Sequence, residues 1–97
     1  MFFVKIHKKL GREVLAICDE EILGKTLEEG DFYFEIKEDF YKGEKLSEEQ
    51  VRVLLKNSPN YNLVGKEIIK IALDLEVVEK ENIIKIKGVP HAQGFIV

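Results

Sequence analysis

The hexapeptide LSEEQV, Leu46 to Val51, is the sharpest structural boundary in the chain. Ser47 and Gln50 have the spacing of a capping box, in which each side chain bonds a backbone N–H that the first helical turn leaves free. Leu46 and Val51 stand at the positions of a hydrophobic staple. The pattern predicts a helix near residues 48–57, which ends before the next proline because that ring disfavours helical geometry in the residue before it.

A second helix is predicted near residues 62–75, directly after this proline. Its expected buried side chains follow spacings of four and three, and they are Val64, Ile68, Ala72 and Leu75. Asn62 is a favourable residue for its N-cap.

Four segments carry strand signals, mainly the alternation of apolar and polar residues. They lie near residues 2–7, 12–18, 32–37 and 83–87. Since three strands precede the helices and one follows, the chain order is β-β-β-α-α-β. We therefore expect an α+β fold with two layers, in which a helical hairpin covers one face of a mainly antiparallel four-stranded sheet. No linker or repeat divides residues 1–97, so we expect a single globular domain.

The charge and composition of the chain argue against some classes of function. The formal net charge of −3 argues against chain-wide attraction to nucleic acid. A local basic cluster at the first turn is the exception, although such clusters are usually solvated turns; it contains Lys5, His7, Lys8, Lys9 and Arg12. The chain has no long apolar run and no leader-like start, which predicts a cytoplasmic protein without a membrane span. The predominance of Glu and Lys among its charged residues is typical of hyperthermophiles.

Few residues suggest chemistry of their own. Cys18 is the single cysteine, which excludes an internal disulfide, and we expect a buried structural thiol. The sequence contains neither a metal-binding motif nor a nucleotide fingerprint, and it suggests no nucleophilic triad. No cofactor is therefore expected.

The first candidate site is the segment GVPHAQ, residues 88–93. Gly88 and Pro90 are expected to stiffen the backbone, and an extended chain would put His91 and Gln93 on one face. A histidine beside an amide offers a general base or a ligand together with directional hydrogen bonds. The alternative is a rigid anchor for the last strand, in which His91 bonds a backbone carbonyl. Phe95 and Ile96 are expected to add apolar contact.

The second candidate is NLVGK, residues 62–66. A helix that starts at Asn62, with Gly65 and Lys66 in its first turn, would attract anions through its free N–H groups. The alternative is an ordinary helix cap. We expect the helix start and the end of the last strand to meet, which would bring Asn62, His91 and Gln93 into one shallow pocket.

Three stretches, VLAICDEEILGKTLEEGD at 14–31, NLVGKEIIKIAL at 62–73 and IIKIKGVPHAQ at 83–93, resemble the archaeal family called domain of unknown function 424. The resemblance covers nearly the whole chain. It implies an association with the archaeal translation apparatus and assigns no catalytic residue. The positions that match the family are Cys18, Asp19, Gly24, Gly30, Asp31, Asn62, Gly65, Gly88, Pro90, His91 and Gln93.

Two functions stay open at this point. The favoured one is a non-enzymatic binding module for RNA, a ribosomal component or a translation factor, with Gly88 to Gln93 as its recognition segment. The alternative is a small enzyme or ligand-binding protein, in which His91 is a general base or ligand beside Asn62 and Gln93. The absence of a converging set of catalytic residue types favours the first.

Overall fold

A computed structural model describes residues 1–94 of the chain. The described chain forms a six-stranded sheet with the strand order β5-β1-β2-β6-β8-β7. Its strands are β1 (Phe2–Lys9), β2 (Arg12–Asp19), β5 (Glu44–Leu46), β6 (Tyr61–Val64), β7 (Ile84–Ile86) and β8 (Val89–Gly94). The α+β class is confirmed, but the expected four-stranded sheet is wrong. Three strands of three to six residues were missed because such short segments carry almost no periodic signal.

The sheet is mixed. β2 and β6 pair in parallel, from Leu15 opposite Tyr61 to Cys18 opposite Val64, whereas the other neighbours pair antiparallel. The predicted strand at residues 32–37 exists as β4 (Phe32–Glu35), but it does not join this sheet. It pairs instead with β3 (Thr26–Glu29) in a separate hairpin.

The helix predicted near residues 48–57 is confirmed as α2 (Glu48–Lys56). The Gln50 N–H donates to Ser47 Oγ over 3.3 Å, and the Ser47 N–H donates to Gln50 Oε1 over 3.0 Å, so the capping box is complete. Val51 and Leu55 are fully buried. The helix therefore begins and faces the sheet as the sequence predicts.

The second helix begins later than predicted. Residues 61–64 are strand β6, and α3 runs from Lys66 to Asp74. The spacing of four between Val64 and Ile68 imitates a helix, but Gly65 between them has φ 128°, a value far outside helical geometry. Asn62 is therefore a strand residue and not an N-cap.

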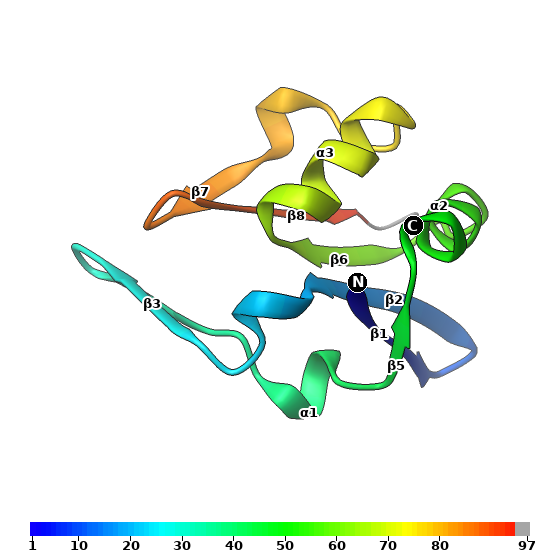
Figure 1. The fold of residues 1–97 in the computed structure, drawn as a ribbon, viewed down its shortest axis with the longest axis horizontal. Helices are drawn as coiled ribbons and strands as arrows, with labels where there is room; N and C mark the ends of the chain where they lie inside the picture. The colour runs from blue at the N-terminus through cyan, green and yellow to red at the C-terminus, as the bar shows by residue number, and fades with distance from the viewer. Residues whose placement is uncertain (95–97) are drawn as a thin grey trace.

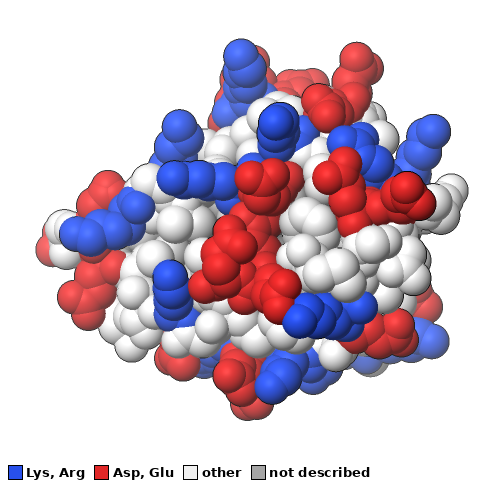
Figure 2. All heavy atoms as spheres, viewed as in Figure 1, with Lys and Arg blue, Asp and Glu red and all other residues white. Residues whose placement is uncertain are grey.

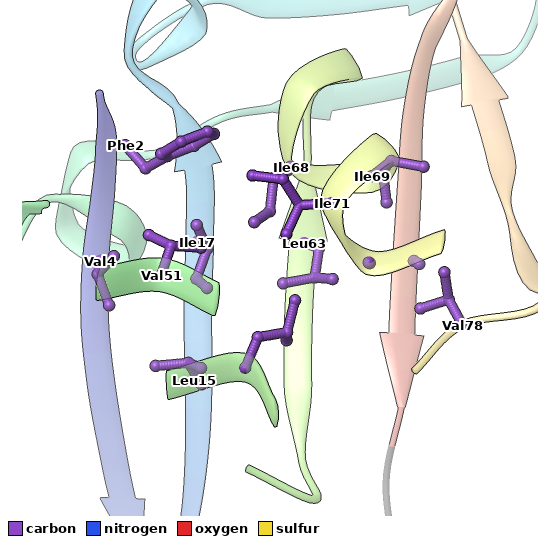
Figure 3. Packing of buried hydrophobic residues seen from close by; sticks show 13 residues of the cluster. Phe2, Val4, Leu15, Ile17, Val51, Leu63, Ile68, Ile69, Ile71 and Val78 are labelled. Atoms are coloured by element: carbon purple, nitrogen blue, oxygen red, sulfur yellow. The ribbon is translucent and has the colours of Figure 1, made fainter. Parts of the chain in front are cut away.

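Both α2 and α3 lie on one side of the sheet (Figure 1). Figure 3 shows the strands side by side and the apolar side chains that fill the space under these helices. The main core consists of Phe2, Val4, Leu15, Ile17, Val51, Leu55, Leu63, Ile68, Ile69, Ile71, Ala72, Val78 and Ala92. The two predicted helices thus lie on one face, but strand β6 separates them in the chain, so the expected helical hairpin is wrong.

The opposite face of the sheet is covered as well, so the predicted two-layer arrangement is incomplete. The short helix α1 (Glu38–Tyr41) and the β3–β4 hairpin lie there (Figure 1). A second core joins them to the sheet through Ala16, Cys18, Leu27, Ile36, Tyr41 and Val64. Burial, with Asp19 beside it, raises the pKa of the Cys18 thiol to about 12, and the thiol is inaccessible as predicted. Within residues 1–94, no helix is long and apolar enough to cross a membrane.

Candidate functional site

Strand β8 separates the predicted site residues between two faces of the sheet. Side chains alternate along a strand, so His91 and Gln93 point to the face of the β3–β4 hairpin, and Pro90 and Ala92 point to the helices. In the pairing of β6 with β8, Asn62 lies opposite Gln93 and Val64 lies opposite His91. Asn62 and His91 are thus diagonal neighbours on one face, a relation that places residues about 7–8 Å apart.

The expected proximity of Asn62, His91 and Gln93 therefore arises, but from strand pairing and not from a helix start. Gln93 is exposed, and Asn62 and His91 are partly buried. Phe95 and Ile96, expected to add apolar contact, lie outside the described residues.

His91 lies under the β3–β4 hairpin. The His91 and Phe34 rings meet edge to face, with 82° between their planes and 4.5 Å between their centroids. Its Nε2 atom is buried and has no hydrogen-bond partner within residues 1–94. Burial lowers the pKa of His91, because a charged ring would lose its hydration there. His91 is consequently a packed, neutral side chain at physiological pH.

Asn62 presents a hydrogen-bond donor to a hollow on this face. The Tyr41 hydroxyl donates to Asn62 Oδ1 over 2.7 Å. Burial, and to a smaller degree the nearby Cys18, raises the pKa of Tyr41, so the hydroxyl keeps its proton. The bond fixes the amide orientation and leaves the Nδ2 hydrogens without a partner within the part of the chain that the structure describes.

His7 and Phe40 form a stacked pair beside Asn62. Their ring centroids are 4.3 Å apart and the ring planes differ by 20°. His7 Nε2 donates to the Phe40 carbonyl over 2.7 Å, which holds the imidazole on the phenyl ring. The Phe40 and Tyr41 rings also meet edge to face, with 4.9 Å between their centroids and 75° between their planes. These contacts therefore hold the His7, Phe40 and Tyr41 rings in fixed positions relative to one another.

Two adjoining hollows of about 420 and 700 Å³ share Phe40 and Asn62, and we call them together the aromatic groove. The first is lined by Tyr33, Phe34, Glu35, Lys37, Phe40, Tyr41 and Asn62. The second is lined by His7, Lys9, Leu10, Arg12, Val14, Phe40, Asn60 and Asn62. Of the candidates in GVPHAQ, neither His91 nor Gln93 lines these hollows, although Gln93 lies directly across the ladder from Asn62.

The aromatic residues of the groove were missed by the sequence analysis. A usable signal was present, because residues 32–41 hold five of the nine aromatic side chains, six Phe and three Tyr in all. The polar spacers Glu35, Lys37 and Asp39 indicate that this segment borders the surface, although its Ile36 and Tyr41 are buried in the second core.

The predicted anion site at the start of the second helix is wrong, because the protein's own carboxylate occupies the helix terminus. Asp19, which is only 3% exposed, accepts from the Glu67 and Ile68 N–H groups, at 2.9 Å each. Burial outweighs these bonds and raises the pKa of Asp19. Gly65 is required here, since a Cβ atom would overlap the Asp19 carboxyl group. Asp19 and Gly65 are therefore structural.

The remaining candidates, Lys66, Gly88 and Pro90, line a different hollow on the helix side, with a volume of about 770 Å³. Its other lining residues are Ile69, Lys70, Leu73, Lys80, Ile83 and Lys85, and we call it the lysine groove. Gly88 and Lys87, with φ 78° and 56°, make the two-residue turn between β7 and β8, which matches the left-handed geometry of tight hairpins.

Comparison with solved structures finds a crystal structure of an uncharacterized conserved protein from Methanopyrus kandleri. It is similar at 26% sequence identity and a TM-score of 0.79, over 99% of this chain and 91% of that chain. Comparison with curated proteins finds no match. The model of a protein family of unknown function, DUF424, matches residues 7–97, and the chain therefore belongs to this family.

Proposed function

We propose that this protein is a non-enzymatic binding module that holds single-stranded RNA in the aromatic groove. The observation that carries the proposal is a set of aromatic rings on one face of the sheet, beside an amide donor and cations that have no partner within residues 1–94. Single-stranded nucleic acids are commonly held by bases stacked on aromatic side chains and phosphates held by basic ones. The association with translation that the family resemblance implies makes ribosomal or messenger RNA the natural class of partner.

Stacking surfaces are supplied mainly by Tyr33 and the His7–Phe40 pair. Tyr33 is 65% exposed and borders the first hollow, so a base can reach its ring. The phenyl ring of Phe40 forms the boundary between the two hollows. The Asn62 amide lies between them and can donate to a base edge, which adds a directional contact to the stacking.

Local charge supports an anionic ligand in spite of the net charge of −3. Lys9, Arg12 and Lys37 border the groove, against the single carboxylate of Glu35. Neither Lys9 nor Arg12 makes an ion pair within residues 1–94, although Lys8 is paired with Glu13 at 3.5 Å. The basic cluster noted at the first turn thus supplies two cations to this groove. Three phosphate contacts predict a weak, salt-dependent interaction with a log–log salt slope of about −2.

Binding is favoured over catalysis by the position of His91. A general base must come within hydrogen-bond reach of its substrate. His91 borders neither hollow, and Phe34 covers its ring. The recognition surface we propose is accordingly the aromatic groove next to Asn62 and Gln93, not the whole segment from Gly88 to Gln93.

The proposal is tested by fluorescence anisotropy with a labelled uridine-rich RNA, its DNA equivalent and an RNA duplex. Tyr33→Ala is compared with Phe32→Ala, because these neighbours are 65% and 66% exposed and only Tyr33 borders the groove. Loss of one stacked base is expected to weaken binding about tenfold in Tyr33→Ala. Phe32→Ala is expected to bind as the wild type does.

Salt dependence provides a second readout of the same complex. Replacing Lys9 and Arg12 together by glutamine is expected to reduce the slope to about −0.7, the value for one remaining phosphate contact. Equal effects of Tyr33→Ala and Phe32→Ala would overturn the proposal. So would a wild-type protein that binds the duplex as tightly as the single strand. A protein that binds none of the three would instead favour the ligand-binding alternative.

A further inference from the structure

The lysine groove lies on the opposite side of the sheet from the aromatic groove and takes no part in the proposed RNA binding. It is bordered by α3, by the short 3-10 helix η2 (Lys80–Asn82) and by the β7–β8 hairpin. Figure 2 shows Lys and Arg side chains over α3 and over the segment that leads into β7, at the upper left of that view. Acidic side chains gather at the centre of the same view, and others lie at its top and left edges.

The charge of the lysine groove is of one sign. Its charged lining residues are Lys66, Lys70, Lys80 and Lys85. None of these four makes an ion pair within residues 1–94, and no carboxylate lines the groove. The net charge of the chain is −3, so the protein as a whole repels acidic proteins. The basic groove attracts acidic groups locally and so directs an acidic partner to this part of the surface.

The floor of the groove is aliphatic. It consists of Ile69 and Pro90, which are buried, together with Leu73 and Ile83, which are half-buried. Among the described residues, no aromatic ring lines the groove, so nucleic acid bases would find cations there without a stacking surface. Aliphatic side chains of a peptide would instead bury apolar area against this floor, at about 25 cal/mol per Å².

The neighbouring strand offers the backbone of such a peptide a place to pair. β7 is the last strand in the order of the sheet, and its outer edge pairs with no strand among the described residues. Lys85, at the middle of β7, borders the groove beside this edge. An extended peptide can add to an exposed sheet edge through main-chain hydrogen bonds, while side-chain pockets select its sequence.

We propose that the lysine groove binds an acidic peptide segment of a partner protein, in which carboxylates alternate with aliphatic residues. The carboxylates pair with the four lysines, and the aliphatic side chains lie on Ile69, Leu73, Ile83 and Pro90. This inference is independent of RNA binding, since no residue is shared between the two grooves.

The experiment uses the full chain and a short fluorescein-labelled peptide of alternating glutamate and leucine. Two control peptides replace either every leucine by serine or every glutamate by glutamine. The double variant Lys70→Glu/Lys85→Glu removes cations from both sides of the groove, and Lys56→Glu/Lys42→Glu makes the same change in net charge at exposed sites elsewhere. The groove variant is expected to bind the peptide at least about tenfold more weakly, and the matched variant to bind as the wild type does.

Several results would overturn the inference. Equal weakening by the two double variants would reduce the interaction to net charge. Equal affinity for the serine-containing peptide would show that the aliphatic floor does not contribute, and displacement of the peptide by single-stranded RNA would assign the groove to nucleic acid. Because the groove variant leaves Tyr33 and Phe40 unchanged, its RNA affinity separates a failure here from a failure of the proposed RNA function.

Discussion

Replacing Asp19 by alanine is expected to destabilise the protein strongly, because this side chain caps α3 from a distant strand. The carboxylate accepts two hydrogen bonds, from the Glu67 and Ile68 N–H groups at 2.9 Å each, and the Ile68 bond is buried. Hydrogen bonds to a charged group contribute about 1.5–3 kcal/mol each, which gives about 3–6 kcal/mol for the pair. The burial that raises the pKa of Asp19 opposes this contribution, since the charge is partly desolvated. We expect a net loss of about 3 kcal/mol in the free energy of unfolding.

Asp19→Asn separates the charge from the hydrogen bonds. Asparagine offers one acceptor oxygen, and its NH₂ group would face the second helical N–H, so we expect a loss of about 2 kcal/mol. The assay is urea unfolding followed by far-ultraviolet circular dichroism. An unchanged slope of the free energy of unfolding against urea concentration would show that the variants and the wild type unfold in comparable transitions. Asp39→Asn, at an exposed carboxylate, is the control and is expected to leave the free energy unchanged. A loss below about 1 kcal/mol for Asp19→Ala would refute the capping argument.

Two further predictions concern stability. Gly65→Ala is expected to lower the free energy of unfolding by about 3 kcal/mol, since it combines a φ of 128° with overlap on Asp19. Gly88→Ala, at φ 78° in open space, should cost only about 1 kcal/mol, and equal losses in urea unfolding would contradict the overlap. Because burial lowers the pKa of His91, the unfolded chain binds that proton more tightly, and stability is expected to fall as the pH drops below about 6.5. Melting temperatures at neutral pH and at about pH 5 should differ less in His91→Leu than in the wild type, and the same difference in both would exclude His91 as the cause.

What could be predicted from the sequence was local. The capping box of Ser47 and Gln50 forms within one helical turn, so the start of α2 was correct. The true start of α3 was not visible in the same way, because its cap is Asp19, a residue of another strand. Because the cap comes from elsewhere, the local sequence favoured Asn62, a more strongly preferred N-cap residue than Gly65, which is the actual N-cap.

The main error in the sheet has a similar cause. β6 is four residues long and contacts the cores on both faces, through Leu63 and Val64, so it shows no alternation of burial. β3 reads TLEE and gave no strand signal, which left β4 to be assigned to the main sheet. Both β6 and β4 take their place from the strands with which they pair. A short segment does not show by itself which strand will be its partner.

The candidate site was predicted in part. Strand pairing brought Asn62, His91 and Gln93 to one face, as the sequence analysis expected on a different argument. Lys66, Gly88 and Pro90 were assigned to the same surface but border the lysine groove behind it. The separation follows from the alternation of side chains along β8, which turns Pro90 to the face opposite His91 and Gln93.

The parallel pairing of β2 with β6 has a consequence for the order of folding. Every residue pair in this ladder, such as Leu15 with Tyr61, lies 46 positions apart in the chain, whereas β1 with β2 and β7 with β8 are local hairpins. Closing the long loop loses more chain entropy, so this ladder is expected to form after the hairpins. The aromatic groove contains His7 from one side of the ladder and Asn62 from the other, and it exists only once the ladder has closed. The lysine groove, made entirely from residues 66–90, is complete within the later half of the chain.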